Sequence, residues 1–174
     1  MMQVKICGIT NIEDALCATE NGAAAVGFIF YPPSPRYIEP QKAGEIIDRL
    51  PEHLVKVGVF VNETAEEIKR IYECCRLDII QLHGDESPEF CRQLPGDRII
   101  KALEVKNEED LKKGFLYVVA AILVDSRHAG LYGGTGKTSN WKLAGRVTKP
   151  LILSGGLKEE NILEALRVVS PAAM

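Results

Sequence analysis

The sequence predicts an α/β fold, and within that class a (β/α)8 TIM barrel made of one domain over residues 1–174. Three observations favour this fold. Short apolar runs rich in β-branched residues alternate with segments of helical periodicity. The runs are almost continuously hydrophobic, as strands in a parallel sheet covered by helices are. Small or polar residues follow nearly every run, at the rim where a barrel builds its active site.

The apolar runs predict seven strands along the chain. They lie at residues 4–7, 25–30, 55–61, 78–83, 98–105, 120–125 and 150–154. Helical stripes lie between most of them, at residues 12–19, 43–50, 65–74, 88–94, 108–116 and 159–168. The segment from Thr10 to Glu13 fits a capping box for the first helix. A shorter helix is expected to start near Ser139.

An open doubly wound sheet is the alternative to a barrel. No Gly-x-Gly-x-x-Gly motif follows the first strand, which weakens the dinucleotide-binding version of that alternative. The residues that end or follow the strands suit a barrel rim instead, and they are Cys7, Gln81, His83, Asp125 and Ser154. These positions favour the barrel.

The number of strands stops at seven. The sequence ends at Met174, where an eighth strand would begin, so the barrel is expected to be C-terminally incomplete and to lack its eighth strand and helix. An open barrel has two unpaired strand edges, and proteins normally avoid such edges because they pair with other chains. Self-association through the open edge is therefore a possible partner interaction.

Composition excludes several classes of function. The net charge is -3 and the sequence pI is about 5.7, whereas a nucleic-acid surface needs a basic stripe. Lys and Arg are scattered, and no apolar run is long enough for a membrane span. The five cysteines show no paired spacing, and the N-terminus does not resemble a signal peptide. We therefore expect a cytoplasmic protein with reduced thiols that binds neither nucleic acid nor membranes.

The stretch LYGGTGKTSN, residues 131–140, ends like a nucleotide-binding loop. A Walker A motif requires glycine five residues before Gly136, and that position is Leu131. Several residues also separate the stretch from the strand that ends at Asp125, whereas a P-loop follows its strand directly. The stretch therefore does not predict an NTPase.

A second glycine pair, Gly155-Gly156, directly follows the seventh strand and precedes a helix. Small residues there allow backbone N–H groups to approach an anion at a helix N-terminus. In barrel enzymes this region is the usual phosphate site. A tight turn that needs glycine flexibility explains the pair equally well.

Several segments, taken in order from near Val4 to Leu157, resemble the phosphoribosylanthranilate isomerase family of tryptophan biosynthesis. The matching segments are VKICGIT, VGFIFYPPSPRYI, VGVFVN, QLHGDE, VDS, GGTGKTSNW and LILSGGL. Each segment alone is weak, but the combination is highly specific. The resemblance implies the (β/α)8 fold, with an eighth strand and helix that extend beyond Met174.

The resemblance also implies an Amadori rearrangement that uses no metal and no organic cofactor. N-(5'-phosphoribosyl)anthranilate would become 1-(2-carboxyphenylamino)-1-deoxyribulose 5-phosphate. A general acid protonates the ring oxygen, and a general base then removes the C2' proton. At the matching positions, Cys7 is the base and Asp125 the acid.

The residues themselves leave alternatives open for both roles. A free Cys is often a small buried core residue, and a cysteine base needs positive charge nearby, which Lys5 on the same strand face could supply. Asp125 follows an apolar strand that would suit a protonated carboxyl, yet it also suits a loop cap. Without the resemblance, neither residue is selected as a catalyst.

The resemblance assigns further residues to substrate binding. Arg36, in a loop with three prolines, would pair with the anthranilate carboxylate, although an isolated Arg is commonly a solvated surface residue. Gln81 and His83 share a strand face and would line the site, although His83 could be purely structural. The remaining binding positions are glycines: Gly134 and Gly136 in a loop over the substrate, and Gly155 and Gly156 at the phosphate.

Two functions therefore remain for the chain. The first is the isomerase. The alternative is a non-catalytic or weakly active truncated barrel that binds phosphate or pairs its open edge with another chain. The catalytic pair is present in the sequence, whereas the family's second group of phosphate-binding amides would lie beyond Met174.

Overall fold

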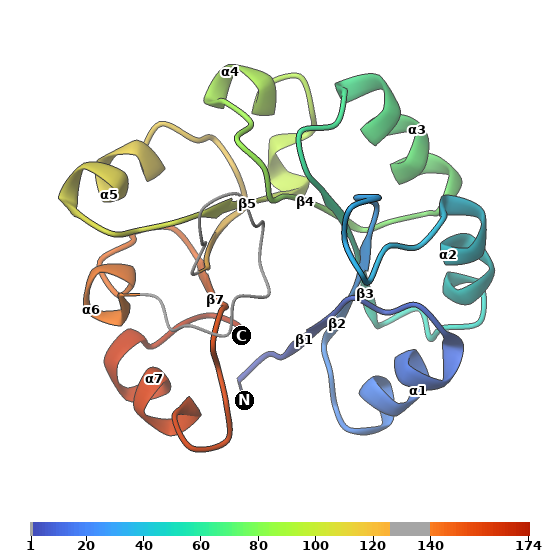
Figure 1. The fold of residues 1–174 in the computed structure, drawn as a ribbon, viewed down its shortest axis with the longest axis horizontal. Coiled ribbons are helices and arrows are strands. Elements are labelled where there is room, and N and C mark those ends of the chain that lie inside the picture. The colour runs from blue at the N-terminus through green and yellow to red at the C-terminus, as the bar shows by residue number, and fades with distance from the viewer. Residues whose placement is uncertain (1, 126–139) are drawn as a thin grey trace. The chain divides into compact units, whose positions relative to one another are not determined.

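The structure is a computed structural model that describes residues 2–125 and 140–174 of the chain. The chain divides into two compact units, Gln3–Glu86 and Ser87–Met174. Both units repeat the same pattern of a strand followed by a helix (Figure 1).

The first unit contains a parallel sheet of four strands. In chain order these are β1 (Lys5–Cys7), β2 (Ala25–Ile29), β3 (Val55–Phe60) and β4 (Ile79–Leu82). Each strand pairs with the next one along the chain, so that β1 pairs with β2, β2 with β3, and β3 with β4. Every connection between neighbouring parallel strands is a crossover, which is what the alternation in the sequence requires.

Three helices of the first unit follow its strands, and they are α1 (Ile12–Glu20), α2 (Pro40–Ile47) and α3 (Ala65–Cys74). The predicted capping box at Thr10–Glu13 is wrong by one residue. Asn11 is the N-cap, because its side chain accepts from the backbone N–H of Asp14 at 2.8 Å. The Asn11 side-chain amide also donates to the Asp14 carboxylate at 2.8 Å, so Asp14 contacts the side chain of the N-cap residue.

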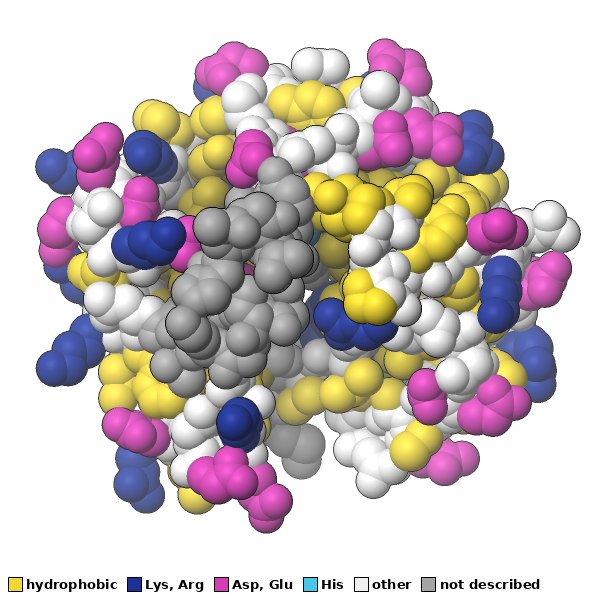
Figure 2. All heavy atoms as spheres, viewed as in Figure 1, with side chains coloured by type: hydrophobic (Ala, Val, Ile, Leu, Met, Phe, Trp, Pro, Cys, Tyr) yellow, Lys and Arg dark blue, Asp and Glu magenta, His cyan; other side chains and the backbone are white. Residues whose placement is uncertain are grey.

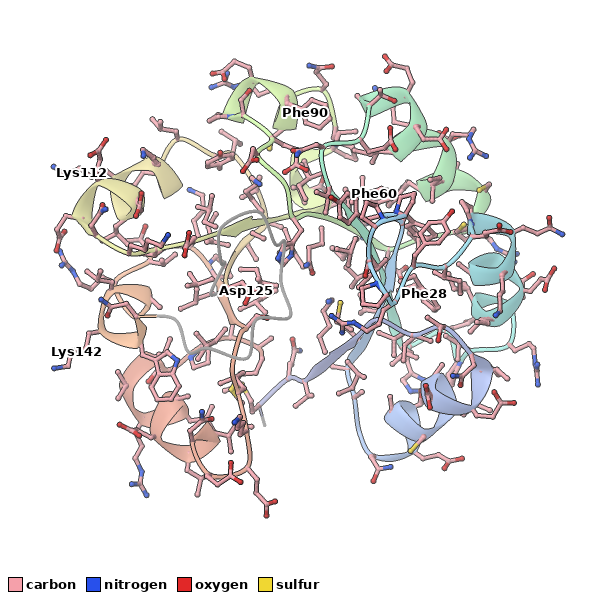
Figure 3. All side chains as sticks on the ribbon, viewed as in Figure 1. Phe28, Phe60, Phe90, Lys112, Asp125 and Lys142 are labelled. Atoms are coloured by element: carbon pink, nitrogen blue, oxygen red, sulfur yellow. The ribbon has the colours of Figure 1, made fainter. Side chains whose placement is uncertain are left out.

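The core of the first unit is built on one face of this sheet. Phe28 and Phe60 are fully buried there (Figure 3), and the ring of Phe60 stacks on that of Phe30 at 5.3 Å between centroids. Helix α3 contributes Ile68, which is also fully buried. These apolar contacts fix the strands, whose opposite face is then free to carry polar side chains.

The second unit contains three parallel strands, β5 (Ile99–Leu103), β6 (Ala121–Val124) and β7 (Leu151–Leu153). Its helices are α4 (Pro88–Cys91), α5 (Glu108–Gly114), α6 (Trp141–Ala144) and α7 (Ile162–Val169), with a 3-10 turn, η1, at Gly96–Arg98. Its apolar core includes Ile122, Val124 and Leu153 from the strands and Ala165 from α7. This unit therefore has a core of its own.

The last residues of the chain lie beside β7. Ala173 forms an isolated parallel bridge with Ile152, and the backbone N–H of Leu153 donates to the Ala173 carbonyl at 2.9 Å. The Ala172 N–H donates to the carbonyl of Leu151 at 2.8 Å. The expected absence of an eighth strand is therefore not confirmed, because residues 172–173 already pair in the direction that such a strand would take.

All seven predicted strands are confirmed within the described residues, each shortened by one to three residues at its ends. The predicted helices are present too, although α2 and α7 start three residues away from the predicted positions. The fold class is α/β with parallel strands. Among the described helices, none combines the length and the apolar character that a membrane span needs.

Candidate active site

Polar side chains of β1 gather on the face of the sheet opposite the buried aromatic rings. Lys5 and Cys7 are in register with Ala25 and Gly27 of β2, and alternate residues of a strand point to the same face. A Cβ atom on Gly27 would lie 3.0 Å from Cys7 Sγ and 3.0 Å from Lys5 Nζ. The thiol and the ammonium group therefore occupy the space that Gly27 leaves open.

Arg36 reaches the end of β1 from the loop that follows β2. Its Nη1 donates a hydrogen bond of 2.9 Å to the carbonyl oxygen of Cys7. Within the loop, the Arg36 backbone N–H donates to Ser34 Oγ at 3.2 Å, which orders the segment before the guanidinium. The proline-rich loop thus brings the predicted carboxylate-binding arginine to the predicted base.

Gly8 makes this approach of Arg36 possible. Its φ of 92° lies in the left-handed region, which side chains other than hydrogen rarely adopt. A Cβ atom on Gly8 would also lie 2.6 Å from Arg36 Cδ and 2.8 Å from Arg36 Nη1. Only glycine therefore satisfies both the backbone turn after Cys7 and the position of the arginine.

The strand register extends the face that carries Cys7 across to β4. Cys7 is in register with Gly27, and Gly27 with Val57. Val57 is in turn in register with Ile79. Gln81 lies two residues after Ile79, so its side chain is on the same face as the Cys7 thiol.

Gln81 and His83 form a buried pair on this face. Gln81 is 2% exposed and His83 is 8% exposed, and Gln81 Nε2 lies 2.8 Å from His83 Nδ1. With the amide in this orientation Nδ1 accepts, and a neutral His83 carries its proton on Nε2. Within residues 2–125 and 140–174, Gln81 Oε1 has no hydrogen-bond partner. An acceptor that is buried and unused suits a polar ligand group.

A buried carboxylate, Glu86, ties the loop after β3 to the loop after β4. Its Oε1 accepts from the backbone N–H of Asn62 at 2.9 Å and from that of Gly84 at 3.1 Å. Asn62 Oδ1 accepts in return from the N–H of Asp85 at 2.7 Å. We call Asn62, Gly84, Asp85 and Glu86 the loop clamp. The loop clamp fixes the backbone directly after His83.

The sequence analysis did not identify the loop clamp, although Gly84 and Glu86 stand in the QLHGDE segment. Their signal is steric and becomes visible only when the loops meet. A Cβ atom on Gly84 would lie 2.3 Å from Asn62 Oδ1 and 2.6 Å from Glu86 Oε1. Asn62 itself adopts a left-handed φ of 52°. The loop after β3 and the loop after β4 can therefore meet only because Gly84 has no side chain.

Asp125 belongs to the second unit and directly follows β6 (Figure 3). It is 3% exposed, and its backbone N–H donates to the carbonyl of Leu103 at 3.2 Å. Val124, the residue before it, points into the apolar core of this unit. Alternation along the strand therefore directs the Asp125 side chain away from that core.

Gly155 and Gly156 form the turn after β7. Both have a left-handed φ, of 84° and 63° respectively, so the turn itself requires glycine. Asn161 braces the turn, because its Nδ2 donates to the Gly156 carbonyl at 2.9 Å. The Lys158 N–H donates to Asn161 Oδ1 at 2.8 Å. This geometry explains the glycine pair as a turn and leaves its phosphate role untested.

Two predicted binding residues, Gly134 and Gly136, lie outside the described residues. Among the residues that the structure does describe, no group of three or more His, Cys, Asp or Glu side chains could hold a metal ion.

Figure 2 shows both positively and negatively charged side chains on the visible face.

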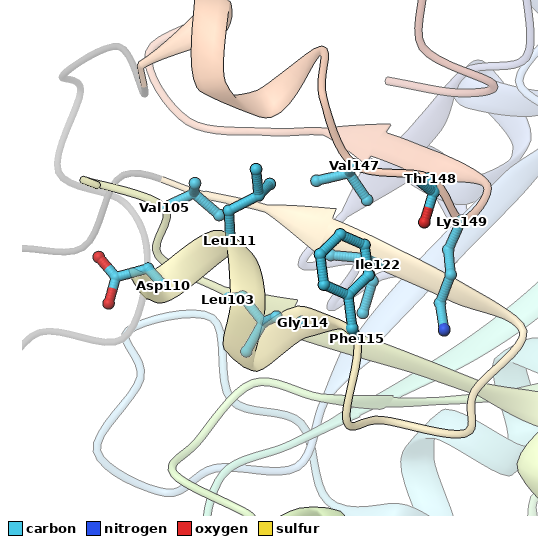
Figure 4. Close-up of a pocket in the computed structure, with 10 residues that line it drawn as sticks. All are labelled: Leu103, Val105, Asp110, Leu111, Gly114, Phe115, Ile122, Val147, Thr148 and Lys149. Atoms are coloured by element: carbon cyan, nitrogen blue, oxygen red, sulfur yellow. The ribbon is translucent and has the colours of Figure 1, made fainter. Parts of the chain in front are cut away.

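An apolar cavity in the second unit is not a substrate site (Figure 4). It lies between α5 and the segment before β7, and Leu103, Leu111, Phe115, Ile122 and Val147 are among its lining residues. Its volume is about 10 Å³, which is at the lower limit for one water molecule. Ile122 belongs to the apolar core, so this cavity is a packing void on the face opposite Asp125.

The chain matches, over residues 4–174, the family described as N-(5'phosphoribosyl)anthranilate (PRA) isomerase. A curated isomerase of that name from Syntrophus aciditrophicus is 51% identical over 176 residues, which is 100% of this chain and 76% of the relative. The corresponding enzyme of Geobacter sulfurreducens is 47% identical, over 100% of this chain and 86% of the relative.

Solved structures of the same enzyme are also similar to the chain. The phosphoribosyl anthranilate isomerase of Thermotoga maritima superposes with a TM-score of 0.90 at 44% identity, over 99% of this chain and 86% of that one. Another, in complex with reduced 1-(o-carboxyphenylamino)-1-deoxyribulose 5-phosphate, superposes with a TM-score of 0.84 at 42% identity, over 99% and 85%. Both the family match and the relatives span nearly the whole chain, which therefore belongs to the N-(5'-phosphoribosyl)anthranilate isomerase family.

Proposed function

We propose that the chain isomerises N-(5'-phosphoribosyl)anthranilate to 1-(2-carboxyphenylamino)-1-deoxyribulose 5-phosphate in tryptophan biosynthesis, without a metal or an organic cofactor. The observation that carries the proposal is the family match over residues 4–174. The solved relative that binds reduced 1-(o-carboxyphenylamino)-1-deoxyribulose 5-phosphate supports this phosphosugar as the small-molecule partner.

In this reaction Asp125 is the general acid and Cys7 the general base. Asp125 donates a proton to the furanose ring oxygen, so the ring C1'–O bond breaks and an imine forms. Cys7 then removes the C2' proton, and the resulting enolamine tautomerises to the ketone. The near-complete burial of Asp125 supports the first role, because an enclosed carboxyl exchanges its proton with the substrate rather than with bulk water. The Lys5 ammonium beside the Cys7 thiol supports the second.

Arg36 binds the anthranilate carboxylate in this proposal. Its Nη1 is already directed at the Cys7 carbonyl, so the other N–H groups of the fork can pair with a carboxylate. Gln81 and His83 contact the substrate from β4, where the Gln81 carbonyl oxygen offers an acceptor. Gly155 and Gly156 present backbone N–H groups to the phosphate, and Gly134 and Gly136 belong to the loop that covers the substrate.

We also propose that residues 1–174 belong to one (β/α)8 barrel domain, and that the protein acts in the cytoplasm. The parallel pairing of Ala173 with Ile152 supports an eighth strand that starts beside β7. Self-association through the edge of β1 is a further part of the proposal. A similar solved structure, with a TM-score of 0.86, concerns monomers of a dimeric phosphoribosylanthranilate isomerase from Thermotoga maritima.

A fluorescence assay on N-(5'-phosphoribosyl)anthranilate tests the function, because isomerisation changes the emission of the anthranilate group. We expect turnover by the chain, and a loss of at least about a hundredfold in kcat for Cys7→Ala and for Asp125→Asn, since each removes a proton-transfer group. Cys17→Ala is the matched control, because Cys17 is an exposed thiol on α1. A wild-type chain without turnover would favour the non-catalytic alternative, and near-full activity of Cys7→Ala would contradict the base assignment.

A further inference from the structure

Lys5 and Cys7 share a small space on the first unit's sheet. Both side chains point to the face of Gly27, and both terminal atoms lie 3.0 Å from the position of a Cβ atom on that glycine. Lys5 is only partly exposed, so its ammonium is not fully surrounded by water. Any side chain larger than hydrogen at position 27 would displace the two groups.

The other charged and titratable groups around Cys7 do not neutralise Lys5. Arg36 adds a second positive charge at the Cys7 carbonyl oxygen. Asp14 and Cys17 of α1 line the same surface hollow as Cys7, and the Asp14 carboxylate accepts from the Asn11 amide. Within the described part of the chain, Lys5 has no ion pair. The net charge that the thiol meets on this strand is therefore positive.

We propose that Lys5 is a positioning residue for the reaction, whose ammonium stabilises the thiolate of Cys7 in the space that Gly27 keeps open. The inference rests on the proposed function, because it assigns to Lys5 the task of preparing the base. The thiolate, and not the thiol, is the species that accepts a proton from C2'.

The test measures the alkylation rate of Cys7 by neutral iodoacetamide at pH 7.5, followed by peptide mass spectrometry. In Lys5→Met the rate falls about threefold, because the thiolate that reacts loses the stabilising positive charge beside it. In Lys5→Arg, which conserves the charge, the rate stays within about twofold of wild type. The exposed thiol of Cys17 gives the reference rate in the same molecule.

Two further measurements separate the effect of the Lys5 charge from that of the Lys5 side-chain shape. Salt at 1 M shrinks the difference between wild type and Lys5→Met, because the attraction is screened. Cys75 serves as the unreactive control, since burial and the hydrogen bond with Cys74 raise the pKa of its thiol to about 12. Equal alkylation rates in wild type and Lys5→Met would overturn the proposal, as would a Lys5→Arg rate as slow as that of Lys5→Met.

Steady-state kinetics connect the result to catalysis. Lys5→Met lowers kcat about threefold or more and changes KM less than twofold, because Lys5 acts through the base and not on the substrate. The alkylation test needs no substrate, so a wild-type chain without turnover would defeat the proposed function and leave the Lys5 result standing. Normal turnover with unchanged Cys7 alkylation in Lys5→Met would defeat only the present inference.

Discussion

Gly8 shows how a single residue can set the position of a binding group. Its left-handed backbone turns the chain at the end of β1, and its missing side chain makes room for Arg36. The guanidinium then reaches the Cys7 carbonyl oxygen. The hydrogen bond between the proposed carboxylate-binding residue and the proposed base therefore depends on this glycine.

We expect Gly8→Ala to raise KM for N-(5'-phosphoribosyl)anthranilate about tenfold, because the added Cβ would displace Arg36 and weaken its bidentate pairing by roughly 1.4 kcal/mol. Steady-state kinetics give the change. Gly22→Ala is the matched control, since Gly22 has a similar φ of 84° but nothing within 4 Å of its Cβ position. Gly22→Ala should lose about 1 kcal/mol of stability and keep its KM. The same KM increase in both variants would contradict the steric explanation.

At this scale the sequence indicated which residues are candidates for the site, but not which atoms surround them. Cys7 and Arg36 could be selected because they stand in segments that resemble a family. The functions of Gly8, Gly27 and Gly84 could not be predicted, because each depends on atoms from another segment. Gly27 has an ordinary backbone conformation, and only the side chains from β1 show why it is glycine.

At the scale of elements, the loop clamp joins the ends of β3 and β4. One carboxylate, Glu86, accepts from the backbone N–H groups of Asn62 and Gly84. It is 5% exposed, so water cannot replace it easily. The loop clamp thereby holds the segment that follows His83, between the end of β4 and the start of α4 at Pro88.

We predict that Glu86→Ala lowers the free energy of unfolding by about 1–3 kcal/mol, because it leaves the buried N–H group of Gly84 and the partly buried N–H group of Asn62 without this acceptor. Glu86→Gln should cost less than half as much, since one amide oxygen can still accept. Urea denaturation measures both values. Glu73→Ala, at an exposed position near the end of α3, should stay within about 0.5 kcal/mol of wild type. A loss for Glu86→Ala no larger than this control would contradict the role of the loop clamp.

The strands were predictable because the strands of a parallel sheet are almost continuously hydrophobic, and the sequence contains seven such apolar runs. Their ends were predicted less well, because the last apolar residue of a run often belongs to a loop, as Val61 and Val105 do. The N-cap of the first helix was predicted one residue too early, because Thr10 and Asn11 are both of the residue types that cap helices and only the backbone conformation distinguishes them. The 3-10 turn at Gly96–Arg98 had no periodic signal at all.

At the scale of the whole molecule, the alternation of strands and helices predicted the α/β class, the residues at the strand ends favoured the barrel over an open sheet, and the family resemblance implied the barrel too. Composition and periodicity alone left an open sheet possible, because both folds use the same strands and helices. The similarity to the Thermotoga maritima isomerase, with a TM-score of 0.90, supports the second choice.

The edge of β1 gives a prediction for the protein in solution. Within the first unit β1 pairs only with β2, and Val4 and Ile6 are 37% and 42% exposed on the face opposite Cys7. Exposed apolar side chains on and beside this strand favour association with a second chain. We therefore expect the chain to self-associate in a concentration-dependent way, as measured by sedimentation velocity.

Ile6→Lys should shift the protein toward the monomer, because a charged side chain at a strand edge opposes pairing with another chain. Val118→Lys is the control, since Val118 is a more exposed apolar residue of the second unit and lies outside any strand. It should leave the sedimentation profile unchanged. If wild type remains monomeric across the concentration range, or if Ile6→Lys and Val118→Lys behave alike, the edge of β1 is not the surface through which the chains associate.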